Sequence, residues 1–265
     1  MTVKELLKKY SKIDETELFL SHLLKCTKED LYINSGDTVT KSIENKLQKL
    51  ISYRTKGVPS AYLLGYKYFY GLKFKVNRHV LIPRPESEWL VDKAIGFITK
   101  KLKTSKCIKV LEIGTGSGCI SISTAKNIQS KNVQFYATDI SGLALKVARE
   151  NAKTHKANVK FAKHDLLTGV KGKFDLVIAN LPYVPVADYK KLYKNLMFEP
   201  KLALTDGTNN FILILRLLSE VKSHLQSKSV IMLEIDPKTP STISSYNPTI
   251  HKDIHSLNRF AIIKN

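Results

Sequence analysis

The first 65 residues carry apolar positions at the spacing of an amphipathic helix. Residues 15–26 place them on one helical face, and residues 42–57 do so again. The apolar positions are Leu18, Phe19, Leu23, Leu24, Ile43, Leu47, Leu50 and Ile51. Gly57, at the end of the second stretch, is a typical helix stop. We therefore expect a small all-helical domain over residues 1–65.

The pattern changes in residues 66–82, YKYFYGLKFKVNRHVLI. Tyrosine, phenylalanine and valine dominate there and partly alternate with polar residues, and Gly71 stands in the middle. This is typical of a β-hairpin, which we interpret as a linker. A helical pattern restarts after Pro85 and opens a second domain over residues 83–265.

Five apolar runs of strand length follow, and helical stretches separate most of them. The runs are residues 107–113, 133–139, 159–165, 174–180 and 229–235. Alternation of strands and helices is typical of a parallel sheet that helices cover on both faces. The predicted fold class is therefore α/β and Rossmann-like, preceded by a small all-α domain and a hairpin.

A glycine-rich turn follows the first of these strands, in VLEIGTGSGCISIS (residues 110–123). The turn consists of Gly114, Thr115, Gly116, Ser117 and Gly118. Glycines permit positive φ and close approach of a ligand, and the following helix offers free N–H groups. A dinucleotide loop needs G-x-G-x-x-G, but Cys119 stands at the third glycine position. The chain also lacks G-x-x-x-x-G-K-[ST], which disfavours a phosphate-gripping nucleotide loop.

Two acids at later strand ends indicate the ligand. Asp139 ends the next strand, where a carboxylate can hold ribose hydroxyls. Asp165 ends the third strand, where a carboxylate can accept from an adenine amino group. With the loop, they predict a site for S-adenosylmethionine, and Glu112 can help to orient its methionine end. Taken singly, Asp139 could be a helix cap and Asp165 a turn residue.

The fourth strand ends in Asn180-Leu181-Pro182-Tyr183. Ligands of open α/β sheets lie outside the carboxyl ends of the strands, so this tetrapeptide should lie beside the methyl donor. An amide or exocyclic amine is a poor nucleophile, because its lone pair is delocalised. The Asn180 oxygen and the Leu181 carbonyl can accept hydrogen bonds from its two N–H groups. Pro182 stiffens the backbone, and Tyr183 can pack on the planar group. Alignment then supplies most of the rate, without a strong general base.

Charge and cysteine content add two points. Lysine and arginine number 43 against 23 acids, a net charge of +20. This favours nucleic acid, ribosomes or an acidic protein surface as partners, although lysines scattered over a solvated surface account for it equally. Cys26, Cys107 and Cys119 form no metal-binding pair and no disulfide framework. We find no signal peptide and no membrane span, and we expect a cytoplasmic protein.

Over nearly its full length the chain resembles the protein-(glutamine-N5) methyltransferases of the HemK/PrmC type, which modify peptide chain release factors in translation termination. The most specific segment is the junction at residues 57–91, GVPSAYLLGYKYFYGLKFKVNRHVLIPRPESEWLV. The other similar segments are residues 110–123, 139–152, 163–167, 174–184, 198–204, 232–235 and 252–263.

The resemblance implies a class I S-adenosylmethionine-dependent methyltransferase with a mostly parallel seven-stranded sheet. Its substrate would be the glutamine side-chain amide of the Gly-Gly-Gln motif in class I release factors, and its product S-adenosyl-L-homocysteine. Residues 1–65 would recognise the substrate, and residues 83–265 would form the catalytic domain. We expect a monomer that uses no metal and does not act at membranes.

The resemblance also implies residue roles. Donor contacts would come from residues 114–118, Asp139, Asp165, Leu166 and Asn180, and the glutamine amide would lie against residues 180–183. Arg84, Pro85 and Glu86 would shape the pocket rim.

Three positions depart from the family pattern. Leu181 replaces the usual first proline of the tetrapeptide, but the needed carbonyl is present in every residue, so activity should survive. Leu166 stands where some members carry an aromatic residue, which would weaken stacking on adenine. Residues 205–211, TDGTNNF, depart from a segment richer in glycine and acids.

Two other functions stay open. The same tetrapeptide suits an N6-adenine or other exocyclic-amine methyltransferase that takes a flipped base. The mixed charge of the first 65 residues and the lack of a known nucleic-acid motif argue against nucleic acid as the substrate. The second alternative is a donor-binding scaffold without activity that docks on ribosomes.

Overall fold

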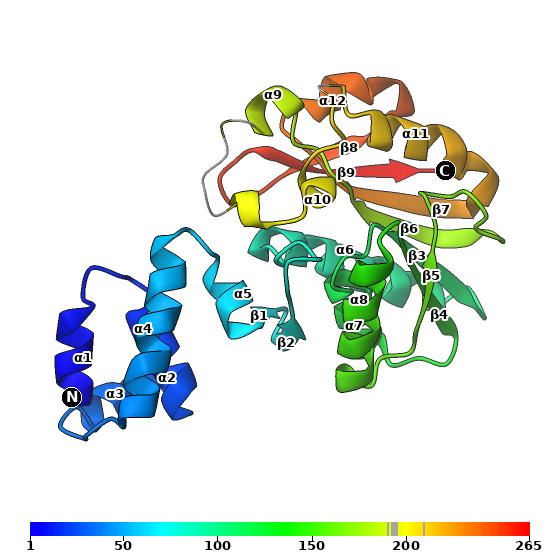
Figure 1. The fold of residues 1–265 in the computed structure, drawn as a ribbon. Coiled ribbons are helices and arrows are strands. Elements are labelled where there is room, and N and C mark those ends of the chain that lie inside the picture. Colours follow the sequence, from blue (N-terminus) through cyan, green and yellow to red (C-terminus); the bar gives the residue numbers. More distant parts are fainter. Residues whose placement is uncertain (190, 192–195, 209) are drawn as a thin grey trace. The chain divides into compact units, whose positions relative to one another are not determined.

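The chain forms two compact units in the computed structural model, which describes residues 1–189, 191, 196–208 and 210–265. The first unit comprises residues 1–65 together with the 3-10 turn η2 (Leu196–Phe198), and residues 1–65 are blue to cyan in Figure 1. The second comprises residues 66–189, 191 and 199–265. Among the described residues, no helix is both long and apolar enough to cross a bilayer.

The first unit is all-helical, as predicted. Its helices are α1 (Val3–Lys9), α2 (Thr16–Leu24), α3 (Lys28–Ile33), α4 (Lys41–Thr55) and α5 (Ser60–Leu64). Capping boxes at Thr2 and Thr27 begin α1 and α3. Phe19 and Leu47 are completely buried in its core. The helix α4 ends just before Gly57, which has a φ of 95°.

The second unit begins with a hairpin of β1 (Tyr66–Phe69) and β2 (Leu72–Lys75). Tyr70 and Gly71 join the strands with φ values of 50° and 71°, as a two-residue hairpin turn of type I′ requires. The strands end at Lys75, so the rest of the predicted hairpin segment, residues 76–82, lies outside them. Three residues of that remainder, His79, Val80 and Leu81, line the cavity described below.

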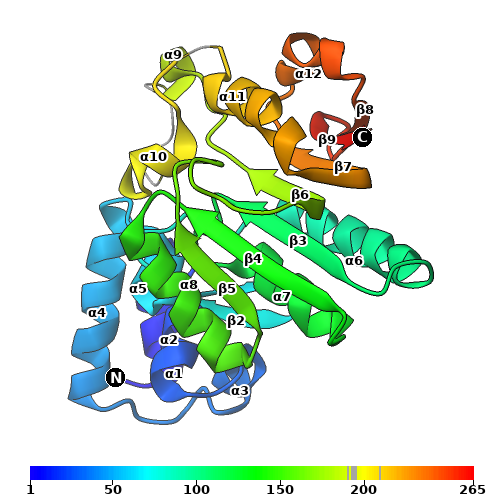
Figure 2. The same cartoon turned by 90° about the vertical axis from the view of Figure 1, so that its right-hand side faces the viewer.

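A seven-stranded sheet forms the centre of the second unit. Its strands are β3 (Ile108–Ile113), β4 (Val133–Asp139), β5 (Val159–Lys163), β6 (Phe174–Asn180), β7 (Leu225–Glu234), β8 (Thr249–Lys252) and β9 (Asn258–Lys264). They run in the order β5-β4-β3-β6-β7-β9-β8. The pairs from β5 to β7 are parallel, and β9 is antiparallel to both neighbours. All five strands predicted from the apolar runs are present, and Figure 2 shows β6, β3, β4 and β5 side by side.

Helices cover both faces of this sheet. The helices of the second unit are α6 (Glu88–Leu102), α7 (Cys119–Ile128), α8 (Gly142–His155), α9 (Val186–Tyr189), α10 (Lys201–Leu204), α11 (Ile212–Glu220) and α12 (Thr239–Thr242), with the 3-10 turns η1 (Pro85–Ser87), η3 (Val221–His224) and η4 (Ser244–Tyr246). On β3, Ile108 and Val110 belong to the core with α6 and α7, whereas Leu111 and Ile113 belong to the core with α11. Side chains of a strand alternate between faces, so burial on both faces explains why β3 reads as a nearly continuous apolar run.

The strand order places a switch point between β3 and β6. From β3 the chain continues to β4 and β5 on one side, and then to β6 and β7 on the other. The loops after β3 and β6 therefore diverge and leave a crevice at the carboxyl ends of the strands.

Candidate active site

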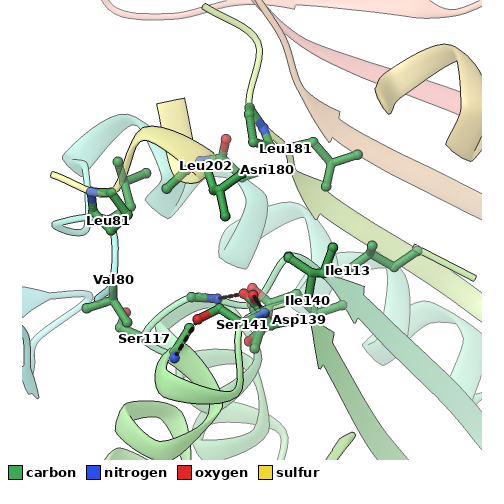
Figure 3. A pocket seen from close by; sticks show the side chains of 18 of the residues that line it. Val80, Leu81, Ile113, Ser117, Asp139, Ile140, Ser141, Asn180, Leu181 and Leu202 are labelled. Atoms are coloured by element: carbon green, nitrogen blue, oxygen red, sulfur yellow. Dashed lines mark hydrogen bonds between the residues drawn. The ribbon is translucent and has the colours of Figure 1, made fainter. Parts of the chain in front are cut away.

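A cavity of about 390 Å³ lies in this crevice, within the size range of small-molecule sites. Its lining comes from residues 79–87, 112–120, 139–144, 164–166, 180–182 and 200–216, though not from every residue of each segment. All of them belong to the second unit. Figure 3 shows Asn180, Leu181 and Leu202 on one side of the cavity, with Asp139 and Ser141 opposite.

Most residues that the sequence analysis singled out line this cavity. They are Arg84, Glu112, Gly114, Thr115, Gly116, Ser117, Asp139, Asp165, Leu166, Asn180, Leu181 and Pro182. Pro85, Glu86, Gly118 and Tyr183 are not part of the lining. Gly118 is the N-cap of α7 with a φ of 81°, and a Cβ there would lie only 2.8 Å from Ile122 Cδ1. Its role in the structure is to begin the helix.

The glycine loop contacts the tetrapeptide directly. Gly114 has a φ of 72°, and a Cβ at this position would lie 3.1 Å from Leu181 Cδ2 and 3.7 Å from the Asn180 carbonyl oxygen. Leu181, one of the positions that depart from the family pattern, is thus buried against Gly114. Leu181 itself lines the cavity, and it carries the carbonyl group that the sequence analysis assigned to the substrate amide.

Asp139 ties the loop to the next helix. Its Oδ2 accepts from the Gly116 N–H at 2.9 Å, and its Oδ1 accepts from the Ser141 N–H at 2.8 Å. Burial raises the pKa of this carboxyl, and the hydrogen bonds to it oppose that shift. The side-chain cap of α8 is Ser141, which accepts from Ala144. Since a carboxylate has about four acceptor positions, Asp139 keeps capacity for a ligand.

Asp165 is engaged by an arginine that the sequence analysis did not assign to the site. Arg216 on α11 donates from Nη1 to both carboxylate oxygens of Asp165, at 3.1 and 3.0 Å. Its Nε also donates to Glu220 at 2.7 Å, and Arg216 lines the cavity. The only signal in the sequence was one arginine within an otherwise apolar helical run.

The segment of residues 205–211 contributes a second acid. Asp206 lines the cavity, and its Oδ1 accepts from both the N–H and the hydroxyl of Thr208. Its Oδ2 is buried and has no hydrogen-bond partner among the described residues. Asn209 lies outside the described residues, so the departure of this segment from the family pattern is described only in part.

Glu112 lies on β3, two residues before Gly114, and is 1% exposed. One of its oxygens accepts from the Thr115 hydroxyl at 2.6 Å, from the Ser121 N–H at 3.1 Å, and from the Ser121 hydroxyl. Burial raises the pKa of Glu112 to about 7, against the lowering effect of these hydrogen bonds.

This raised pKa predicts a pH-dependent stability. The unfolded chain loses the Glu112 proton near pH 4.5, whereas the folded protein keeps it to about 7. Raising the pH across this window therefore favours unfolding, by up to about 3 kcal/mol from this group, and has no further effect above it. Urea unfolding of the protein and of Glu112→Gln at several pH values should show a steeper decline in the wild type. Asp139 and Glu234, whose pKa values burial also raises, contribute to the decline in both proteins. An identical pH slope in both would contradict the assignment.

The end of β6 is part of a buried hydrogen-bond chain. Asn180 Nδ2 donates to Ser87 Oγ at 3.2 Å, and Ser87 Oγ donates to Glu234 Oε2 at 2.5 Å. The Tyr183 hydroxyl donates to Glu234 Oε1 at 2.9 Å, and its ring packs against the core. Burial raises the pKa of Tyr183 above its ordinary value. Packing of Tyr183 on a substrate amide stays a prediction.

Another buried acid, Glu199, supports the rim of the cavity. Glu199 accepts from the Ile82 N–H at 2.9 Å and from Arg84 Nη2 at 2.5 Å. Glu199 is 4% exposed, whereas the side chain of Arg84 is 31% exposed and lines the cavity. Glu199 thereby holds residues 82–84, which precede α6, in place.

Comparison with known families identifies two regions. Residues 2–65 match the model of the PrmC N-terminal domain, and residues 87–231 match that of the methyltransferase small domain. Among solved structures, the human hMettl16 catalytic domain in complex with MAT2A 3'UTR hairpin 6 is similar with a TM-score of 0.55. The two are 14% identical, and the match covers 73% of this chain and 76% of that one. This likeness shows the class I methyltransferase fold alone.

Relatives of known name are more similar. A "release factor glutamine methyltransferase" from Bacillus cereus is 37% identical over 223 residues, covering 83% of this chain and 78% of the relative. Proteins of the same name from Rhodopirellula baltica and Leptospira interrogans are each 32% identical, covering 93% and 94% of this chain and 85% and 90% of theirs. Such identity over most of both chains, on a fold with the predicted cavity, shows that the chain belongs to the release factor glutamine methyltransferase family.

Proposed function

We propose that this protein methylates the side-chain amide of the glutamine in the Gly-Gly-Gln motif of peptide chain release factors, with S-adenosylmethionine as the donor. The observation that carries the proposal is the position of Asn180. Its side-chain nitrogen is bound to Ser87, which leaves its oxygen as an acceptor at a cavity that the glycine loop also lines. Membership of the family supports the substrate.

The residues at the cavity suit S-adenosylmethionine. Because Gly114 and Gly116 have no side chains, the loop backbone at these two positions is open to a ligand. Asp139 can accept further hydrogen bonds, from ribose hydroxyls, besides the one from Gly116. The hydroxyl of Ser117 is buried and has no oxygen or nitrogen as a hydrogen-bond partner among the described residues. Its neighbour there is the Cys119 thiol, which forms only weak hydrogen bonds. When bound, the donor supplies an electrophilic methyl group on a sulfonium.

Three further residues would contact the donor. Asp165, held by Arg216, and Leu166 would bind the adenine end, and Asn180 would lie at the reacting end. Leu166 has a φ of 48° and is 6% exposed, so it offers an apolar surface rather than an aromatic one.

The chain's own residues then align the substrate nitrogen. The Asn180 oxygen and the Leu181 carbonyl accept hydrogen bonds from its two N–H groups, which directs its lone pair toward the methyl group. The same acceptors stabilise the positive charge that develops on nitrogen. With the donor bound, the C–N bond would form as the C–S bond breaks with its electron pair going to sulfur, and the nitrogen would release one proton to solvent.

The partner in this proposal is a class I release factor that presents its Gly-Gly-Gln loop to the cavity. Residues 1–65 would form the recognition domain, residues 66–82 the linker and residues 83–265 the catalytic domain, with the protein acting as a monomer. The matches to the PrmC N-terminal domain and the methyltransferase small domain support this division.

Peptide mass spectrometry tests the proposal. The protein, S-adenosylmethionine and a purified release factor are incubated together, with duplex DNA and an RNA in parallel reactions. We expect one added methyl group on the Gly-Gly-Gln glutamine and none on any base. Methylation of a base but not of protein would favour the nucleic-acid alternative, and donor binding without any transfer would favour the scaffold.

A further inference from the structure

The side chain of Asn180 is hydrogen-bonded to the hydroxyl of Ser87, which in turn is hydrogen-bonded to the buried acid Glu234. We propose that Ser87 and Glu234 are positioning residues that fix the orientation of the Asn180 amide, so that its oxygen and not its nitrogen is presented to the substrate. This inference rests on the proposed function and adds two residues to its machinery. Neither residue was assigned to the site from the sequence.

The proposal follows from counting hydrogens along the chain of contacts. An ionised carboxylate only accepts hydrogen bonds, so Glu234 requires a donor at each oxygen. Ser87 and Tyr183 supply their hydroxyl hydrogens, at 2.5 and 2.9 Å. A serine hydroxyl has one hydrogen, so Ser87 can then only accept from Asn180. The group of Asn180 that faces Ser87 must therefore be the NH₂.

Reversing the amide would break this chain. If the oxygen of Asn180 faced Ser87, two acceptors would meet without a hydrogen between them. A substrate amide would then meet the NH₂ of Asn180, two donors facing each other. Burial makes such mismatches costly, and Ser87 and Glu234 are only 3% and 2% exposed.

The surrounding fold keeps the three residues in register. Asn180 and Glu234 are directly paired residues of the parallel strands β6 and β7, at their carboxyl ends. Ser87 comes from η1, immediately before α6. Arg259 on β9 lies over the ring of Tyr183, and its Nε donates to Asp253 Oδ2 at 3.2 Å. Burial raises the pKa of Glu234, whereas the hydrogen bonds from Ser87 and Tyr183 and the charge of Arg259 favour its ionised, accepting form.

Two substitutions test the proposal by kinetics. Ser87→Ala removes the acceptor for the NH₂ of Asn180. Glu234→Gln replaces one carboxylate oxygen by an NH₂, so that either the Ser87 hydroxyl or the Tyr183 hydroxyl loses its acceptor. We expect each to lower kcat for release factor methylation at least tenfold, while the Kd for S-adenosylmethionine by calorimetry stays within about twofold of wild type.

The matched control is Asp175→Asn. Asp175 is also a buried acid on β6, but it lies at the opposite end of the strand, where it accepts from the Lys109 N–H and pairs with Lys101. Its substitution should leave kcat unchanged. Unchanged kcat in Ser87→Ala and Glu234→Gln, or a parallel loss of kcat and donor affinity, would overturn the proposal.

A spectroscopic test does not depend on the release factor. With ¹⁵N-labelled asparagine, the side-chain amide signals of Asn180 are assigned by their disappearance in Asn180→Ala. They should shift and exchange faster with water in Ser87→Ala and Glu234→Gln, and stay in place in Asp175→Asn. Unshifted signals would overturn the proposal even if kcat falls. If the wild-type protein does not methylate a release factor, the proposed function fails while this test still decides the orientation of Asn180.

Discussion

Replacing Asn180 by alanine should lower methyl transfer by about 100- to 1000-fold, the usual effect of removing one group that stabilises charge in a transition state. The substitution removes one of the two acceptors that align the substrate nitrogen, and it also leaves Ser87 without its donor. Donor affinity should change only modestly, because the loop and Asp139 remain intact. The measurements are kcat by quantitative mass spectrometry and the donor Kd by calorimetry.

The matched control for this substitution is Asn127→Ala. Asn127 lies on α7, where its side chain also donates a hydrogen bond, to the Ser123 carbonyl at 2.8 Å, but it does not line the cavity. It should retain wild-type turnover. Turnover by Asn180→Ala at the wild-type rate would show that the amide is not needed for alignment.

Replacing Asp139 by alanine should weaken donor binding by about 100-fold. Hydrogen bonds to a charged group contribute roughly 1.5–3 kcal/mol each, and about 2.7 kcal/mol corresponds to a hundredfold change in Kd. The substitution would remove the acceptors for ribose hydroxyls and also the bonds that hold Gly116 and Ser141. The effect should therefore appear in the donor Kd, and kcat at saturating donor should largely recover.

An exposed acid provides the comparison for Asp139. Asp92 on α6 accepts from the Tyr70 hydroxyl at 2.6 Å and does not line the cavity, so Asp92→Ala should bind the donor like wild type. A wild-type Kd in Asp139→Ala would rule out the ribose assignment. Calorimetric titration with S-adenosyl-L-homocysteine gives the same comparison without turnover.

The sequence predicted those parts of the fold that depend on local pattern. The strands β3 and β6 were recognisable because burial on both faces leaves few polar positions. The short edge strand β8 was not, because its four residues, TIHK, include two exposed ones. The glycine turn was recognisable because its positive φ angles favour glycine. Asp139 was recognisable because holding ribose hydroxyls at a strand end calls for a carboxylate.

The contacts that complete the candidate site could not be predicted in the same way. Asn180 and Ser87 are 93 residues apart, and Arg84 and Glu199 are 115 apart. Nothing in the local sequence of either partner indicates the other, because the packing of α6 and the loops against the sheet brings them together. The ion pair of Asp165 with Arg216 could not be predicted for the same reason, since the two residues are 51 apart in the sequence.

The pairing of β6 with β7 restricts where the chain can change its length. Asn180 and Glu234 are opposite each other in the ladder, and side chains alternate between faces along a strand. Inserting or deleting one residue within either strand would turn one of the two side chains to the other face of the sheet. Length variation among relatives, and the insertion of tags or loops by design, should therefore not be tolerated inside either strand, nor next to the cavity-lining residues that the chain places between them.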